Sequence, residues 1–205
     1  MKCKLAVLFL VLVFWVDFSN SQTVNKDSIH YNYFLGTSFW SIANLFPDAA
    51  DFYELDFGYR YTGKDAIILR AITWKYNAPL GIPFNSSLYG SSDEKYLGYV
   101  RAFGIGIGYQ RYIWRGLFSS VYATPFLQNF YDSDSKKTNN GFQLFLQGYI
   151  GYRIQLFKNR FYIESSIAFN YWPINTNFPE TFLQKENKWP NYFLFEPHFN
   201  LGLNF

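Results

Sequence analysis

The segment FYELDFGYRYT, residues 52–62, alternates large apolar side chains with polar or small ones. From Tyr53 to Tyr61 the odd positions hold tyrosine, leucine or phenylalanine, and the even ones hold Glu54, Asp56, Gly58 and Arg60. Successive side chains of a β-strand point to opposite faces, so this period of two predicts a strand. One face of the strand is oily and the other is charged.

The same period recurs in eight segments rich in Tyr, Phe, Ile and Val, without a convincing amphipathic helix. The predicted strands are 30–40, 52–62, 65–76, 97–113, 117–131, 141–157, 160–172 and 192–205. We expect tight connections at 62–65, 114–117 and 157–160, and longer ones at 41–51, 77–96, 132–140 and 173–191. Strict alternation of short turns and long loops is typical of membrane barrels, whose short turns face the periplasm. The sequence therefore predicts an all-β fold: an eight-stranded antiparallel up-and-down transmembrane β-barrel with longer extracellular loops.

The first residues, MKCKLAVLFLVLVFWVDFSNSQ, have the layout of a secretory signal peptide. A basic start precedes an apolar run at 5–16, and Ser19 and Ser21 occupy the −3 and −1 positions of a cleavage site. The run is too short to span a bilayer as a helix. We expect residues 1–21 to be removed and residues 22–205 to form one β-barrel domain. Cys3 is the only cysteine, so the mature chain would contain no thiol nucleophile and no disulfide.

Composition excludes several classes of protein. The mean hydropathy of −0.12 and the absence of a second long apolar run exclude a helical membrane protein. The chain has 18 basic and 15 acidic residues, and without Lys2, Lys4 and Asp17 these numbers become 16 and 14. A nucleic-acid-binding protein is expected to carry a larger excess of basic residues. Two distant histidines match no metal-ligand spacing, and GIGIG at 104–108 lacks the Lys-Ser/Thr of a phosphate loop. We therefore expect no nucleic acid, no metal and no cofactor.

Charged residues within the predicted strands fall mainly on the polar face. An Arg or Lys facing lipid at mid-bilayer costs about 2–4 kcal/mol, so inward placement is expected. An eight-stranded barrel is just wide enough for side chains to fill it, so these groups should pair inside rather than line a channel. The expected interior network is Glu54, Asp56, Arg60, Arg70, Arg153, Glu164, Glu196 and His198.

Arg101 does not follow this rule, because it shares its parity with Phe103, Ile105 and Ile107. Two explanations stay open: a bulge after Arg101 shifts the register, or Arg101 lies near an interface and extends its charge toward water. Under either, the glycines at 104, 106 and 108 would leave room inside for bulky neighbours or ease curvature.

The tryptophans give a weaker sign of membrane interfaces. Those at 40, 74, 172 and 189 fall at or near predicted outer strand ends. This placement is similar to the aromatic girdles of membrane proteins.

The last predicted strand ends in FNLGLNF, residues 199–205, with Phe199, Leu201, Leu203 and Phe205 on one face. Together with the signal peptide and the alternating strands, it resembles the small outer-membrane β-barrel proteins of Gram-negative bacteria. The terminal Phe205 and the apolar residues before it resemble the signal read by the barrel-assembly machinery in that family. The resemblance implies location in the cell outer membrane, contact with its lipids, and contact with that machinery during biogenesis.

The family includes structural barrels, adhesins, lipid-modifying enzymes and subunits of larger machines, so the fold alone does not assign a function. We expect a filled barrel with a structural or interaction role, and the loops at 77–96 and 173–191 are candidates for a protein partner. A lipid A deacylase or acyltransferase is the enzyme alternative, with Ser166, Glu196 and His198 as weak catalytic candidates. Against it, the deacylases' His-x-Ser pattern is missing, because Asn200 stands two residues after His198.

A secreted soluble barrel that binds an apolar ligand is the third alternative. It would place the oily residues inside and the charged ones outside. The charged faces of the second and eighth strands would then meet water, and the full aromatic faces would line the cavity. If the apolar residues instead faced outward and the charged residues inward, a soluble barrel would expose an apolar surface of a size that is rare on soluble monomers.

Overall fold

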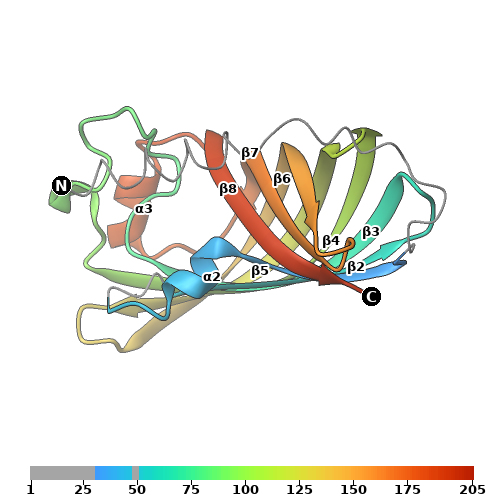
Figure 1. The fold of residues 1–205 in the computed structure, drawn as a ribbon. Helices are drawn as coiled ribbons and strands as arrows, with labels where there is room; N and C mark the ends of the chain where they lie inside the picture. The colour runs from blue at the N-terminus through green and yellow to red at the C-terminus, as the bar shows by residue number, and fades with distance from the viewer. Residues whose placement is uncertain (1–30, 48–50) are drawn as a thin grey trace. The chain divides into compact units, whose positions relative to one another are not determined.

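The structure, a computed structural model, describes residues 31–47 and 51–205, so the predicted signal peptide at 1–21 lies outside the described residues. Tyr31–Phe205 form one compact unit in which eight antiparallel strands follow each other around a closed barrel (Figure 1). β1 pairs with both β2 and β8, which closes the ring. The strands are β1 (Tyr33–Ser38), β2 (Phe52–Arg60), β3 (Asp65–Tyr76), β4 (Gly98–Trp114), β5 (Leu117–Asp132), β6 (Lys137–Leu156), β7 (Phe161–Asn175) and β8 (Tyr192–Asn204). The prediction of an all-β fold with eight up-and-down strands is confirmed.

One predicted connection is wrong. The expected long loop at 132–140 is a tight hairpin, because β5 continues to Asp132 and β6 begins at Lys137. The backbone N–H of Ser135 donates to the carbonyl of Asp132 at 3.1 Å, and the Asp132 carboxylate accepts from the N–H groups of Asp134 and Lys136. The polar, turn-forming residues therefore form a hairpin that extends the sheet. Short turns and long loops do not alternate strictly along the chain.

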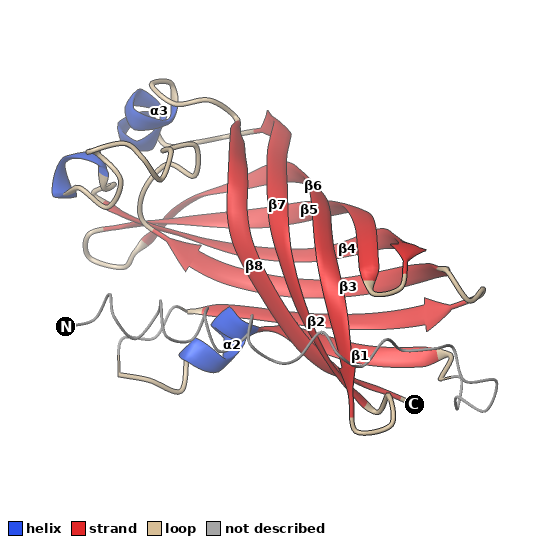
Figure 2. Ribbon diagram, turned by 45° about the horizontal axis from the view of Figure 1, so that its top comes forward, coloured by secondary structure: helices blue, strands red, loops and turns tan. Residues whose placement is uncertain are grey.

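The other three connections at that end are longer and contain short helices (Figure 2). These are α2 (Phe39–Ala43), the 3-10 helix η1 (Ser92–Glu94) and α3 (Glu180–Glu186). The Ser38 hydroxyl caps α2 by accepting from the Trp40 N–H at 3.3 Å, so the first strand passes directly into a helix. Among the described helices, none is long and apolar enough to cross a membrane.

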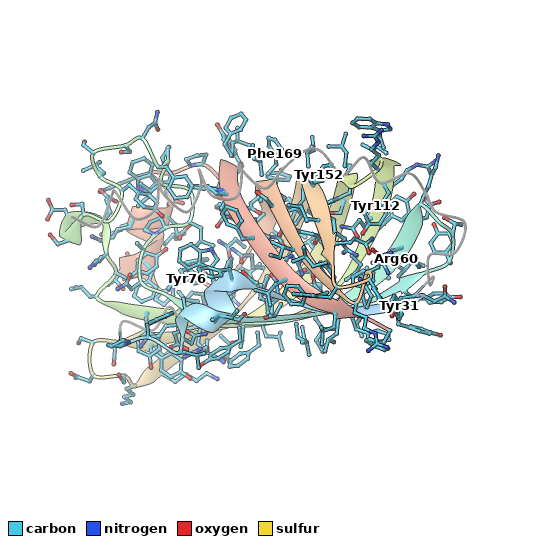
Figure 3. All side chains as sticks on the ribbon, in the orientation of Figure 1. Tyr31, Arg60, Tyr76, Tyr112, Tyr152 and Phe169 are labelled. Atoms are coloured by element: carbon cyan, nitrogen blue, oxygen red, sulfur yellow. The ribbon has the colours of Figure 1, made fainter. Side chains whose placement is uncertain are left out.

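The exposed fractions of the side chains follow the alternation of the sequence. Leu55 and Phe57 are 49% and 42% exposed on the outside of the ring, whereas Glu54 and Asp56 between them are 4% exposed inside it. Figure 3 shows the side chains on both faces of the strands, with Arg60 and Tyr112 toward the end where the chain terminates. The barrel therefore has its apolar residues outside and many of its charged residues inside.

Strand β4 keeps one register with both neighbours from Arg101 to Arg111, so no bulge separates Arg101 from Phe103, Ile105 and Ile107. Arg101 lies on the outward face and pairs with Asp51 at 2.5 Å, near the end with the long loops, which decides between the two explanations above. A Cβ on Gly106 or Gly108 would clash with the side chains of Thr124 or Tyr122. These glycines therefore make room inside the barrel for β5 residues.

Two tryptophans do not belong to a surface girdle. Trp172 is 1% exposed and stacks on Phe145, with ring centroids 5.4 Å apart. Trp74 points inward as well and stacks on Phe126 at 5.5 Å. These rings form an aromatic layer across the barrel, closed by Ile72, Ala102 and Phe193. Trp40 and Trp114, by contrast, are 49% and 61% exposed.

Candidate functional site

The interior below the aromatic layer is organised around Arg70, which is 1% exposed. Its guanidinium donates to both carboxylate oxygens of Asp56, at 2.8 and 2.7 Å, and lies 3.5 Å from the Glu54 carboxylate. Asp56 lies directly opposite Arg70 on the neighbouring strand, so the register of β2 and β3 sets this pair. The hydroxyl of Tyr149 accepts from Arg70 at 3.0 Å, and the Tyr122 ring stacks under its charge at 3.9 Å.

A second cluster surrounds Arg153 nearer the tight turns. Glu164 lies opposite Arg153 on β7 and accepts from its Nε at 2.7 Å. Gln110 joins the two by donating to Glu164 at 3.0 Å and accepting from Arg153 at 3.3 Å. The Tyr162 ring covers the guanidinium at 3.9 Å. Fork-shaped donors and planar faces make arginine well suited to such buried, stacked pairs.

These two clusters fill the barrel rather than line a channel. The cavity between them, bordered by Arg70, Gln110 and Ser120, measures about 10 Å³, which is about the space that one water needs. A buried ion pair contributes little net stability compared with an apolar pair, but removal of one partner costs about 3–5 kcal/mol. Each arginine therefore depends on its acidic partner, while the intact pairs add little net stability.

The remaining predicted interior residues are more dispersed. Arg60 is partly buried and donates to Asn204 at 2.9 Å and to the Tyr31 carbonyl. Glu196 accepts from Asn170 at 2.6 Å, and Asn170 in turn accepts from Gln147. The structure thus brings Glu54, Asp56, Arg70 and His198 into one cluster and Arg153 with Glu164 into another.

Sequence reasoning missed the tyrosine and glutamine members of these clusters. Tyr122, Tyr149 and Tyr162 are buried inward residues that share hydrogen bonds or ring faces with the arginines. The sequence pattern indicates no role for them, because tyrosine resembles the outward aromatic residues in a hydropathy pattern. Strict parity was the available signal, since the buried positions of β5 and β7 are even-numbered and those of β6 are odd-numbered.

The three catalytic candidates do not make the contacts of a nucleophile, base and acid. The Ser166 hydroxyl donates to the backbone carbonyl of His198 at 3.3 Å, and not to its ring. The carboxylate paired with His198 Nε2 belongs to Glu54, at 3.7 Å, and the imidazole packs on Tyr149 at 5.1 Å between centroids. Glu196 is engaged with Asn170. A serine nucleophile needs its base within about 2.6–3.2 Å, and this arrangement does not provide it.

The residues of the predicted assembly signal lie at the seam of the ring. Phe199, Leu203 and Phe205 are 39%, 54% and 56% exposed on the outward face, and Leu201 is half-buried. The backbone N–H and carbonyl of Phe205 bond to Tyr33, at 2.9 and 3.0 Å. The final residue therefore pairs with the first strand and completes the closure.

The two longest loops fold against each other into one cap, which we define as residues 77–97 and 176–191. The Tyr96 ring stacks on Phe182 with centroids 4.3 Å apart, and Phe182 is 2% exposed. The Trp189 indole donates to Glu94 at 3.1 Å, and the Lys188 ammonium lies 3.7 Å from the same carboxylate. The cap is therefore a packed structure with its own small core.

A partly buried carboxyl group, that of Glu186, lies within the cap. The Tyr96 hydroxyl donates to the Glu186 carboxylate. Burial raises the pKa of Glu186 above its ordinary value, partly offset by this hydrogen bond, and burial also raises the pKa of Tyr96. Phe84, Leu88 and Tyr89 of the cap are 47%, 39% and 51% exposed, and the Phe84 ring also packs on Phe193 of β8 with centroids 4.5 Å apart.

Within residues 31–47 and 51–205, no group of three or more His, Cys, Asp or Glu side chains is placed to hold a metal ion. The chain matches no family model, no curated protein and no solved structure.

Proposed function

We propose that this protein is an integral outer-membrane β-barrel with a filled interior. The observation that carries the proposal is the belt of apolar side chains on the outward face. On β4 this belt runs through Phe103, Ile105 and Ile107, which are 48%, 67% and 62% exposed. It is bounded by charged pairs at both ends, Arg101 with Asp51 and Arg111 with Asp65.

The height of the belt matches a bilayer. Arg101 and Arg111 are ten positions apart, which at about 3.3–3.4 Å per residue gives about 33 Å along the strand. Strands of outer-membrane barrels are tilted by about 35–45°, which reduces this length to about 25 Å, the height of the apolar band in that class. An exposed apolar surface of this extent would be a strong aggregation hazard in water.

The interior argues for a structural or interaction role rather than for a pore. The two arginine clusters and the aromatic layer occupy successive levels of the barrel.

The cap, with Phe84, Leu88 and Tyr89 on its surface, is the part of the chain best suited to meet a protein partner. Replacing Leu88 and Tyr89 by serine should abolish partner contacts, and Phe84 is left unchanged because its ring packs on Phe193 of β8. If cross-linking on intact cells captured the same partners with the variant as with the unmodified protein, the proposed interaction role of the cap would be refuted.

The two other functions have less support. A soluble ligand-binding barrel would need an apolar interior, but the levels of Arg70 and Arg153 are charged. A lipid-modifying enzyme would need Ser166, His198 and Glu196 to act together, and their contacts are made elsewhere. Lipid mass spectrometry of cells with the protein, without it and with His198→Ala tests this activity directly.

Single cysteines test the membrane topology, because Cys3 is the only natural cysteine and lies in the predicted signal peptide. In intact cells, a membrane-impermeant maleimide should label Tyr89→Cys in the cap and spare Gly63→Cys in a tight turn. Ile105→Cys should stay unlabelled in membranes and react after detergent and urea.

Protection of Ile105→Cys, with labelling of Gly63→Cys only after the cells are opened, is the result expected. Equal labelling of all three cysteines in intact cells, or release of the protein from membranes by urea, would refute the proposal. As a control, Asp134→Cys in the β5–β6 hairpin should react like Tyr89→Cys, since both lie at the same end of the strands.

A further inference from the structure

The outward face of β3 and β4 carries a charged cross-strand pair at each end; one pair joins opposite charges and the other joins two positive charges. Near the tight turns, Asp65 lies opposite Arg111 and the two form an ion pair at 3.0 Å. Near the cap, Lys75 lies opposite Arg101, so two cations face each other. Like charges directly opposite each other destabilise a pair of strands. The second pair therefore favours binding of an anion.

The described neighbours only partly neutralise this pair. Asp51 accepts from both terminal nitrogens of Arg101, at 2.7 and 2.5 Å, but a guanidinium has five N–H donors. Lys75 is exposed, and among the described residues no carboxylate forms an ion pair with it. Its ammonium lies 4.1 Å from the centroid of the Tyr99 ring. Two cations and one carboxylate leave a net positive charge at the edge of the apolar belt.

An apolar groove lies one outward cross-strand pair away from this charge. The next outward pairs along the two strands are Thr73 with Phe103 and Ala71 with Ile105, the first about 7 Å from the cations. Ala71 and Thr73 are small, and they lie between larger residues of β2 and β4. The groove crosses the strands from Thr37 of β1 to Phe142 of β6, and neither Lys75 nor Arg101 lines it. Its outward lining residues include Tyr53, Leu55, Ala71, Thr73, Phe103, Ile105, Pro125 and Leu127.

We propose that this end of β3 and β4 binds one phosphate-bearing lipid, with the phosphate on Lys75 and Arg101 and an acyl chain in the groove. The inference rests on the proposed function, because only a protein embedded in a bilayer presents this face to lipids. Charge complementarity identifies the headgroup: charge-assisted hydrogen bonds from arginine and lysine are a common way to hold phosphate. Continuity of the groove with the apolar belt identifies the chain.

Native mass spectrometry of the full protein, extracted from membranes in mild detergent, tests this site. The probes are phosphatidylglycerol and a diacylglycerol with the same acyl chains. Lys75→Gln with Arg101→Gln should weaken phosphatidylglycerol binding by about tenfold or more, as expected for lost charge-assisted hydrogen bonds. Arg111→Gln, on the same face at the other end of β4, should leave it unchanged. Lys75→Arg should retain binding.

The groove is tested by Ala71→Trp, which should weaken binding of both lipids, with the outward Val121→Trp as the matched control. Three results would overturn the inference: equal affinity for the two lipids, an equal loss in Arg111→Gln, or no loss in the double variant. Resistance of the wild-type protein to urea extraction from membranes is measured in parallel. If the protein resists extraction and yet shows no lipid preference, this site alone is refuted. If urea releases it, the proposed function fails as well.

Discussion

At the scale of single residues, the apolar belt determines which outward positions tolerate a charge. Ile105 lies near the middle of the stretch between Arg101 and Arg111, so Ile105→Arg should lower the free energy of unfolding by about 2–4 kcal/mol in a bilayer. Ile113, equally outward but beyond Arg111, should tolerate arginine at a cost of about 0–1 kcal/mol. Urea unfolding of both variants in lipid vesicles measures the difference. Similar stability of the two would contradict a bilayer around β4.

The Arg70 cluster gives a second prediction for a single residue. Arg70→Met leaves the carboxylates of Asp56 and Glu54 buried without their partner and should cost about 3–5 kcal/mol of unfolding free energy. Adding Asp56→Asn and Glu54→Gln to Arg70→Met should restore part of the lost unfolding free energy, because neutral side chains are less costly to bury. Arg111→Met, which breaks a half-exposed pair, should cost less than about 1 kcal/mol. An equal loss in both arginine variants would argue against an isolated interior cluster.

At the scale of elements, the cap depends on pH through Glu186. Because the folded cap raises the pKa of this carboxyl, it binds the proton more tightly than the unfolded segment does. The cap is therefore most stable below the ordinary glutamate range, and it loses stability as pH rises through the raised value. Hydrogen exchange of residues 177–191, corrected for intrinsic rates, should show protection that decreases over this window.

Glu186→Gln should remove that pH dependence, and Glu180→Gln, at the first residue of α3, should keep it. Protection that rises with pH in the unmodified protein would mean that the Glu186 carboxylate, rather than its protonated form, stabilises the cap.

Strand β8 shows how an element can depart from its sequence pattern. Between Ala168 and Phe169 the register with β7 shifts by one residue, and Phe195 adopts a positive φ of 62°. This bulge allows Phe193 and Glu196, which differ in parity, both to lie inside the barrel. Strict alternation predicts which residues point inward on each side of the bulge. It does not predict where the bulge lies.

At the scale of the whole molecule, the filled interior predicts a barrel that does not conduct ions. Purified protein in planar bilayers should give no steady open channel. Replacing residues 79–95 with a short Gly-Ser linker should not create one, because the levels of Arg70 and Arg153 occlude the barrel below the cap. Conductance in the shortened variant alone would show that the cap, and not the interior, closes the barrel.

The sequence by itself determined the strand number, the order of the strands and which side of each strand is oily, because a period of two leaves few alternatives over eight segments. It placed Glu54, Asp56 and Arg70 on one face for the same reason. Only the tertiary structure decided which charges meet: Arg70 with Asp56 depends on the register between strands, which sequence periodicity does not fix. The packing of the cap and the inward orientation of Trp74 and Trp172 were also decided only by the tertiary structure, because loop packing and ring stacking join residues far apart in the chain.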